Sequence, residues 1–186
     1  MIRVRDDDVL TPSKEFIKKP GGPAGRFRGI HKLIIQNTEK FIHVPTIVVD
    51  DIQAFPEVVE YIRDETEAGR MLPEIHGLEH IDYGARDDET VTDHLKQCKE
   101  FLHHEFGVYA TKWYTPWGAD SPVLRELASE LDLELVGVKD RIEPSEVVNA
   151  FKHNPTKARE KYSDCEIMIH WWEGGANKLD FLTKEF

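Results

Sequence analysis

The hydrophobic positions alternate between short β-branched runs and longer stretches with helical spacing. Short apolar runs, typical of strands, cover residues 2–4, 45–49, 72–75, 108–113, 133–138 and 166–169. Apolar residues recur every three or four positions elsewhere, which predicts helices over residues 27–41, 56–69, 122–131 and 144–151. A segment rich in Pro and Gly, residues 11–26, and a lysine-rich segment, residues 152–165, are predicted to be connections.

Local signals mark where several helices begin and end. Ser121 followed by Pro122 is typical of a helix N-terminus, because the serine caps and the proline fits the first turn. A further helix is predicted to begin near Thr90 or Thr92 as its cap and to end at Gly107. About six strands in alternation with helices indicate a parallel β/α fold. A doubly wound sheet and a closed or incomplete barrel both fit this pattern.

Length and composition predict one globular domain over residues 1–186. The chain is 40% hydrophobic and 32% charged, ordinary values for a domain large enough to bury a core. Its formal net charge of −11 argues against a nucleic-acid partner, because no basic surface is indicated. The acidic balance suits a neutral or cationic substrate, or simply serves solubility. Cys98 and Cys165 are far apart in the sequence and are predicted to be small buried residues.

Nothing in the sequence predicts a membrane or secretory segment. The N-terminal residues 1–6 contain no apolar signal-peptide core. No apolar run approaches the ~20 residues that a membrane-spanning helix needs. The sequence therefore predicts a cytoplasmic protein with no membrane partner, and it carries no prediction of oligomeric state.

Polar residues gather where the predicted strands end. In chain order these are Asp6 to Asp8, His76 with His80, the loop Pro116-Trp117-Gly118, Asp140 and His170. Active sites of parallel β/α folds assemble at the carboxyl ends of the strands. We therefore expect these residues to converge on one face of the sheet.

The spacing of His76 and His80 is that of half a metal site. The two imidazoles can reach one cation if the segment turns helically, and one carboxylate completes a set with positions open for water and substrate. The aspartates 6–8 are the preferred source of that carboxylate, and Asp50-Asp51 is the rival pair. Such a spacing also arises by chance in a chain with nine histidines. The others are interpreted as structural or surface residues: His31, His43, His94, His103, His104 and His153.

Aromatic residues also lie near the predicted strand ends. They are Trp113, Tyr114, Trp117, Trp171 and Trp172. Such residues are equally expected in a core or in a cleft that stacks against sugars. A second aspartate beside the metal ligand could act as general base, and His170 could protonate a leaving group.

Four segments together resemble one known family. They are Val4-Arg5-Asp6-Asp7-Asp8-Val9, His76-Gly77-Leu78-Glu79-His80, Tyr114-Thr115-Pro116-Trp117-Gly118 and Met168-Ile169-His170. Their order and strand-end placement are similar to the motifs of the polysaccharide deacetylase group (NodB homology, carbohydrate esterase family 4). This resemblance implies an α/β fold, a deformed or incomplete (β/α)7-type barrel with mainly parallel strands.

The resemblance also implies a role for each matching residue. Asp8, His76 and His80 would bind a divalent metal, with zinc expected, and Asp7 would be the general base. A shift by one residue, which the third aspartate permits, would move the two aspartate roles to Asp6 and Asp7. The backbone N–H of Trp117 would help to form the oxyanion hole. His170 would be the general acid, and Asp140 is the nearest candidate to orient it, in a fourth motif that matches poorly.

One departure from the family pattern concerns the base. Tyr114 stands where the family has an arginine that orients the base aspartate. The resemblance implies a hydrolase that uses metal-activated water to remove an N-acyl (acetyl) or O-acyl group from a carbohydrate substrate. Two alternatives stay open: an inactive, carbohydrate-binding relative, which the tyrosine favours, and a hydrolase of a small non-sugar amide.

Overall fold

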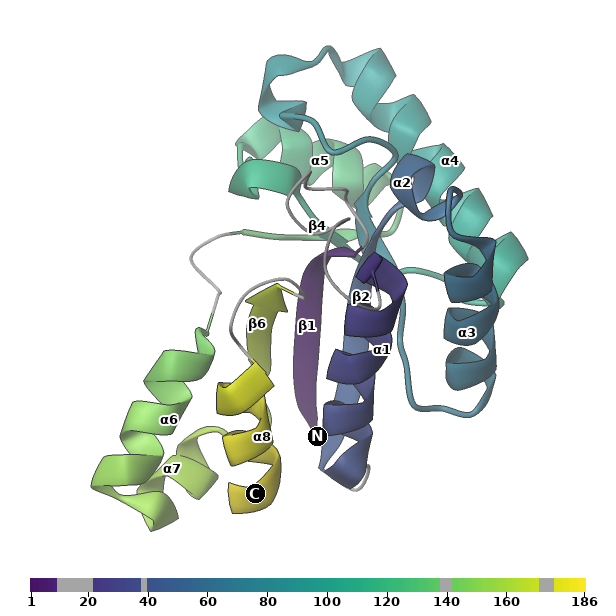
Figure 1. Ribbon diagram of the computed structural model, residues 1–186. Helices are drawn as coiled ribbons and strands as arrows, with labels where there is room; N and C mark the ends of the chain where they lie inside the picture. The colour runs from purple at the N-terminus through teal and green to yellow at the C-terminus, as the bar shows by residue number, and fades with distance from the viewer. Residues whose placement is uncertain (10–21, 38–39, 138–141, 171–175) are drawn as a thin grey trace.

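The computed structural model describes residues 1–9, 22–37, 40–137, 142–170 and 176–186 (Figure 1). Its strands are β1 (Ile2–Val9), β2 (Phe41–Val48), β3 (Glu74–Gly77), β4 (Lys112–Tyr114), β5 (Glu134–Val136) and β6 (Glu166–His170). Its α-helices are α1 (Gly22–Ile34), α2 (Val49–Ile52), α3 (Pro56–Glu67), α4 (Asp88–Phe106), α5 (Pro122–Glu130), α6 (Pro144–His153), α7 (Pro155–Lys161) and α8 (Ala176–Glu185). Three short 3₁₀ turns are η1 (Ile35–Asn37), η2 (Tyr83–Ala85) and η3 (Pro116–Gly118).

The six strands form one parallel sheet that curls into part of a barrel. Its order is β5-β4-β3-β2-β1-β6, and every pair of neighbours is parallel. In a flat sheet β4 and β6 would lie about 19 Å apart, four strand spacings. Yet the Tyr114 hydroxyl on β4 donates to Glu166 Oε2 on β6 at 2.7 Å. The prediction of an incomplete barrel is therefore confirmed, and the doubly wound alternative is wrong.

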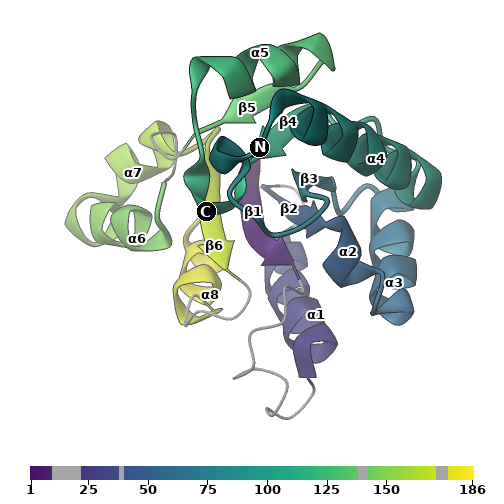
Figure 2. The same cartoon turned by 90° about the horizontal axis from the view of Figure 1, so that it is seen from above.

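The barrel stays open between β5 and β6. Within the described residues no ladder joins these two strands, and Ile142 alone forms a bridge to Ile167 on the free edge of β6. Helices line the outer side of the arc of strands (Figure 2). One apolar cluster fills the space between β2 to β5 and α3, α4 and α5, and a second lies among β1, β6, α1, α6, α7 and α8.

Several predicted elements need correction at their ends. The helix predicted over residues 27–41 begins earlier, at Gly22, and η1 ends it before Phe41 opens β2. The lysine-rich connection contains α7, which Asn154 caps by accepting from the Lys157 N–H. Asp87, rather than a threonine, caps α4, since its side chain accepts from Thr90 N–H. Helix α8 had no predicted counterpart.

Other expectations are confirmed. Ser121 caps α5 and Pro122 opens it, and Gly107 ends α4 with φ +68°. Cys98 is buried as expected, whereas Cys165 is only half-buried and does not meet that expectation. His103 and His104 are exposed on α4.

In the described part of the chain, no helix combines the length and hydropathy that crossing a bilayer requires.

Candidate metal centre

Strand β1 changes its backbone conformation at Asp8. In a regular strand Asp6 and Asp8 would point to the same face. Asp8 instead has φ +55°, and the register with β2 shifts between Asp6 and Val9. A left-handed conformation is rare outside glycine, although aspartate tolerates it better than most residues. The consequence is that Asp8 turns away from the helix layer and toward the histidines of the β3 region.

The two histidines come from different backbone environments. His76 lies inside β3, and His80 lies in the bend that follows it. The helical turn that would let two histidines at this spacing share a cation is therefore not present, because the strand continues through Gly77 and a bend follows at residues 78–80. The bend still brings the two imidazole rings to 5.4 Å between centroids.

Neutral side chains support the bend at residues 78–80 through hydrogen bonds and close packing. The Tyr83 hydroxyl accepts from Leu78 N–H at 3.0 Å and contacts Glu79 O at 3.4 Å. The indole Nε1 of Trp113 donates to the His76 carbonyl at 3.1 Å. A Cβ at Gly77 would lie 2.8 Å from Glu79 O and from the Tyr83 hydroxyl, so only glycine fits. From the sequence, no role was assigned to Tyr83 or to Gly77.

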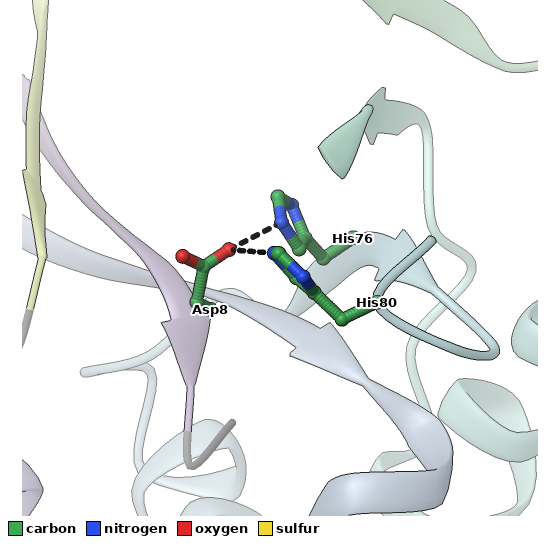
Figure 3. Close-up of side chains that lie close together, drawn as sticks. All are labelled: Asp8, His76 and His80. Carbon is green, nitrogen blue, oxygen red and sulfur yellow. Dashed lines mark hydrogen bonds and ion pairs between the residues drawn. The ribbon is translucent and has the colours of Figure 1, made fainter. Parts of the chain in front are cut away.

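Asp8, His76 and His80 converge on one point (Figure 3). Oδ1 of Asp8 lies 2.5 Å from His76 Nε2 and 2.9 Å from His80 Nε2. Their candidate ligand atoms all lie within 4.8 Å of one another, which no other cluster of three such side chains achieves among the described residues. Asp50 and Asp51, the rival carboxylates, are not in this group.

The donor set fits a divalent transition metal. His76 is buried, and neither of its ring nitrogens makes a hydrogen bond of regular geometry within the described residues. Buried polar atoms normally have hydrogen-bond partners, and in the described part of the chain the His76 ring nitrogens have only the close ion-pair contact of Nε2 with Asp8 Oδ1, which suits a ring that binds a cation together with that carboxylate. Two imidazoles with one carboxylate are the protein ligands typical of a catalytic zinc site with an open position. Asp8 and His80 remain partly exposed, which gives water and substrate access.

The electrostatics favour an ionised Asp8. Burial disfavours its charged form, but the contacts with His76 and His80 outweigh burial and hold the pKa of Asp8 well below its usual range. Burial likewise disfavours a charged His80, yet the hydrogen bond to Asp8 and the charges of Asp8 and Asp51 raise the pKa of His80. The site therefore holds a carboxylate and attracts positive charge.

Asp7 points into the barrel beside this centre. It is 2% exposed, and both of its oxygens accept from the guanidinium of Arg5 at 2.7 Å. Oδ1 also accepts from the Thr46 hydroxyl at 3.2 Å. Sequence reasoning did not single out Arg5 or Thr46. The available signal for Arg5 was its position two residues before Asp7, which places both side chains on the same face of a strand.

Two further predicted residues border the centre. His170, at the end of β6, is paired in register with Asp7, and its Nε2 lies 3.9 Å from Asp8 Oδ2. Trp117 packs edge-on against His80 with ring centroids 5.0 Å apart. Its side chain is 73% exposed, and its backbone has φ +57°. Such a strained, exposed aromatic residue is typical of a functional loop.

Other predicted site residues lie elsewhere. Asp6 faces the helix layer, where its Oδ2 is 3.6 Å from His43 Nε2. It is therefore not part of the group that contains His76 and His80. Asp140, Trp171 and Trp172 lie outside the described residues, and the role of Asp140 stays a prediction. Of the remaining aromatic residues, Trp113 and Tyr114 are buried, whereas Trp117 is exposed.

No protein-family model and no curated protein matches the sequence. Solved structures do match its fold. A family 4 carbohydrate esterase from Streptomyces lividans, in complex with acetate, aligns with a TM-score of 0.65 at 14% identity, over 99% of this chain and 85% of that one. A peptidoglycan N-acetylglucosamine deacetylase aligns with a TM-score of 0.68 at 14% identity, over 99% and 79%.

A family 4 pseudoenzyme from Bacillus anthracis also matches. Its TM-score is 0.65 at 9% identity, and the alignment covers 99% of this chain and 59% of that one. At these identities the likeness concerns the fold. The expected resemblance to the polysaccharide deacetylase group is thus confirmed for the architecture, and the neighbours include both enzymes and a pseudoenzyme.

Proposed function

We propose that this chain is a metal-dependent hydrolase that removes an acetyl group from the nitrogen of an amino sugar. The observation that carries the proposal is the convergence of Asp8, His76 and His80 beside Asp7 and His170, at the carboxyl ends of β1, β3 and β6. The shared fold with carbohydrate deacetylases supports the same substrate class. Fold alone does not fix function, so the proposal rests on the site.

Asp8, His76 and His80 would hold one divalent cation, for which zinc is the best candidate given two nitrogen ligands and one oxygen ligand. The chemistry that such a cation supplies is polarisation of the acyl carbonyl and a lowered pKa for bound water. His76 is buried and fixed by β3, whereas His80 lies at the rim. This arrangement leaves the open side of the centre toward Trp117 and solvent.

Asp7 and His170 would divide the proton transfers. Asp7 accepts the proton of the water molecule whose oxygen bonds to the acyl carbon, since its oxygens have acceptor capacity beyond the bonds from Arg5 and Thr46. His170 donates a proton to the sugar nitrogen as the C–N bond breaks, so that a neutral amine leaves. The two residues are partners in the register of β1 and β6, and His170 Nε2 lies 3.9 Å from Asp8 Oδ2.

Trp117 would serve the reaction in two ways. Its backbone N–H would donate to the carbonyl oxygen while negative charge develops there, which is the step at which fixed donors contribute most. Its exposed indole beside His80 offers a flat apolar face against which a sugar ring could pack.

The test is acetate release from an N-acetylglucosamine oligomer by the zinc-loaded protein. We expect release that stops on addition of a chelator and returns with zinc, and at least a ~100-fold lower kcat in Asp7→Asn. Asp93→Asn, which alters an exposed carboxylate on α4 outside the ligand group, is the matched control and should stay active. Release that survives both chelation and His76→Ala would overturn the proposal.

A second candidate is a binding protein without turnover. Tyr114 in place of the family arginine and the presence of a pseudoenzyme among the structural neighbours favour it. The same experiment separates the two, because oligomer binding to the zinc-loaded protein without any acetate release supports the binding protein. Release of acetate from small non-sugar amides, but not from the oligomer, would instead support a hydrolase of small non-sugar amides.

A further inference from the structure

A buried arginine contacts the proposed base from its own strand. Arg5 is 2% exposed, and its Nε and Nη2 each donate to a different oxygen of Asp7 at 2.7 Å. A charged side chain is almost never so buried unless it is paired. A guanidinium that binds both oxygens fixes the plane of the carboxylate as well as its position. Burial disfavours the charge on Arg5, but Asp7 outweighs it, and the pKa of Arg5 is raised.

Side chains from two other strands hold Arg5 in turn. Its guanidinium lies over the ring of Tyr114 from β4, 4.4 Å from the ring centre. Its Nη1 lies 3.5 Å from Glu166 Oε1 on β6. The Tyr114 hydroxyl donates to the other oxygen of Glu166 at 2.7 Å, so the two supports are themselves joined. Side chains on β4 and β6 therefore confine the guanidinium within the barrel interior.

Arg5 and Lys112 lie against the carboxylates of Asp7 and Glu166, and Lys112 Nζ is 3.5 Å from Glu166 Oε2. Glu74 on β3 is a third buried carboxylate, which accepts from the Lys112 backbone N–H, and burial raises its pKa. A second arginine at position 114 would place a buried cation beside Arg5, and this repulsion is costly. The tyrosine there is instead a neutral, flat surface for the guanidinium to rest on. The interior therefore accommodates one arginine against Asp7, and that arginine comes from β1.

We propose that Arg5 is the positioning residue of this site, holding Asp7 in the orientation that general-base catalysis requires, with Tyr114 and Glu166 as its supports. This role rests on the proposed function of Asp7. The arginine that the family pattern places at position 114 is then relocated to β1 rather than lost. Tyr114 accordingly becomes compatible with turnover instead of a mark of inactivity.

The experiment compares acetate release by Arg5→Met, Arg5→Lys and the double variant Arg5→Met/Tyr114→Arg. Because misplacing a catalytic group by about 1 Å can cost 100-fold, we expect kcat of Arg5→Met to fall ~100-fold, with KM and zinc content unchanged. Arg5→Lys keeps the charge but cannot donate to both Asp7 oxygens as the guanidinium does, and a kcat about tenfold lower is expected. The double variant should recover at least about tenfold over Arg5→Met, because the two positions are coupled.

Arg3, an exposed arginine at the start of the same strand, is the matched control, and Arg3→Met should retain full kcat. Tyr114→Phe keeps the ring under Arg5 but removes the bond to Glu166, so a several-fold lower kcat is expected even if Arg5→Met fails to fold. Unchanged kcat in Arg5→Lys and Tyr114→Phe, with an active wild type, overturns the role of Arg5 alone. A wild type without acetate release overturns the proposed function and this role with it.

Discussion

The two segments that build the proposed metal centre are held in place by different forces. Asp7 and Asp8 on β1 are surrounded by charged or ionisable partners, since Arg5 binds Asp7 on the inner face and His43 lies behind Asp6 on the outer face. The bend that carries His80 after β3 is held by neutral groups, the Tyr83 hydroxyl, the Trp113 indole and the close packing at Gly77.

This difference predicts how each segment fails. The β1 segment depends on charge and on an unusual backbone conformation at Asp8, so changes of charge and of pH should act on it. The β3 segment depends on shape, so small steric changes should act on it. Both segments contribute ligands to the proposed cation site, so damage to either should appear first in metal affinity.

The largest effect is expected at Asp8. Asn tolerates the left-handed backbone as well as Asp does, so Asp8→Asn keeps the turn but removes the charged ligand. Outer-shell changes alone cost 10–100-fold in metal affinity, and we expect loss of this ligand to weaken zinc binding by at least about 100-fold. Competition with a chromogenic chelator measures the affinity. Equal zinc affinity in Asp8→Asn and wild type would remove Asp8 from the ligand set.

A single methyl group should disrupt the β3 segment. In Gly77→Ala the new Cβ would meet Glu79 O and the Tyr83 hydroxyl at 2.8 Å, and the cost should be about 1–3 kcal/mol of unfolding free energy, with weaker zinc binding. Gly29→Ala, an exposed position in α1 with nothing within 4 Å, should instead stabilise by about 0.5–1 kcal/mol. Urea unfolding measures both. If the two variants behaved alike, steric bracing of the bend would be refuted.

Acid should weaken the support behind β1. His43 stacks on His31, both are buried, and burial lowers the pKa of each, with Asp6, Glu65 and Arg70 as the charged groups around them. Below a pH of about 6.5 the unfolded chain binds protons that the folded chain does not, so stability falls by up to about 1.4 kcal/mol per pH unit for each histidine.

The unfolding free energy of the metal-free protein, measured between pH 7.5 and 5.5, tests this dependence. His43→Leu cannot titrate, and its stability should fall less steeply over the same range than that of the wild type. Titrating groups that contact neither His43 nor His31 are common to both proteins, so their contributions cancel in the difference, whereas His31 contacts His43 and its titration is part of the effect measured. A steeper fall in the variant would contradict the buried neutral state of His43.

The smallest effect is expected from one hydroxyl. Tyr83→Phe removes the acceptor for Leu78 N–H but keeps the ring packing against Trp113, so a loss of about 1 kcal/mol is expected. Tyr109→Phe, at a side chain that is 75% exposed, should change stability by less than about 0.5 kcal/mol. Thermal unfolding of the pair distinguishes them, and identical melting temperatures would argue against the brace.

Features with local causes were the ones that the sequence could predict. Ser121 and Pro122 specify the start of α5 by themselves, and the β-branched run before Asp50 indicates β2. Helix α7 carried the same kind of signal, an Asn154 cap before Pro155, which its lysine-rich composition obscured. The incomplete barrel followed from the family resemblance, since strand alternation alone fitted two architectures.

Features that depend on tertiary contacts could not be predicted. The positive φ of Asp8 accompanies its contact with His76 on β3, and no local sequence pattern specifies it. The contact of Arg5 with Tyr114 exists only because the sheet curls and brings β4 across to β1 and β6. The absence of an arginine at position 114 was visible in the sequence, but its replacement from β1 required the structure.

The most direct test of the shared centre is anomalous diffraction at the zinc edge from crystals grown with zinc. We predict one strong peak in contact with Asp8 Oδ1, His76 Nε2 and His80 Nε2, with Asp7 still bound by Arg5 beside it. A protein that releases acetate while zinc is absent from this position, or bound only elsewhere, would contradict the central claim.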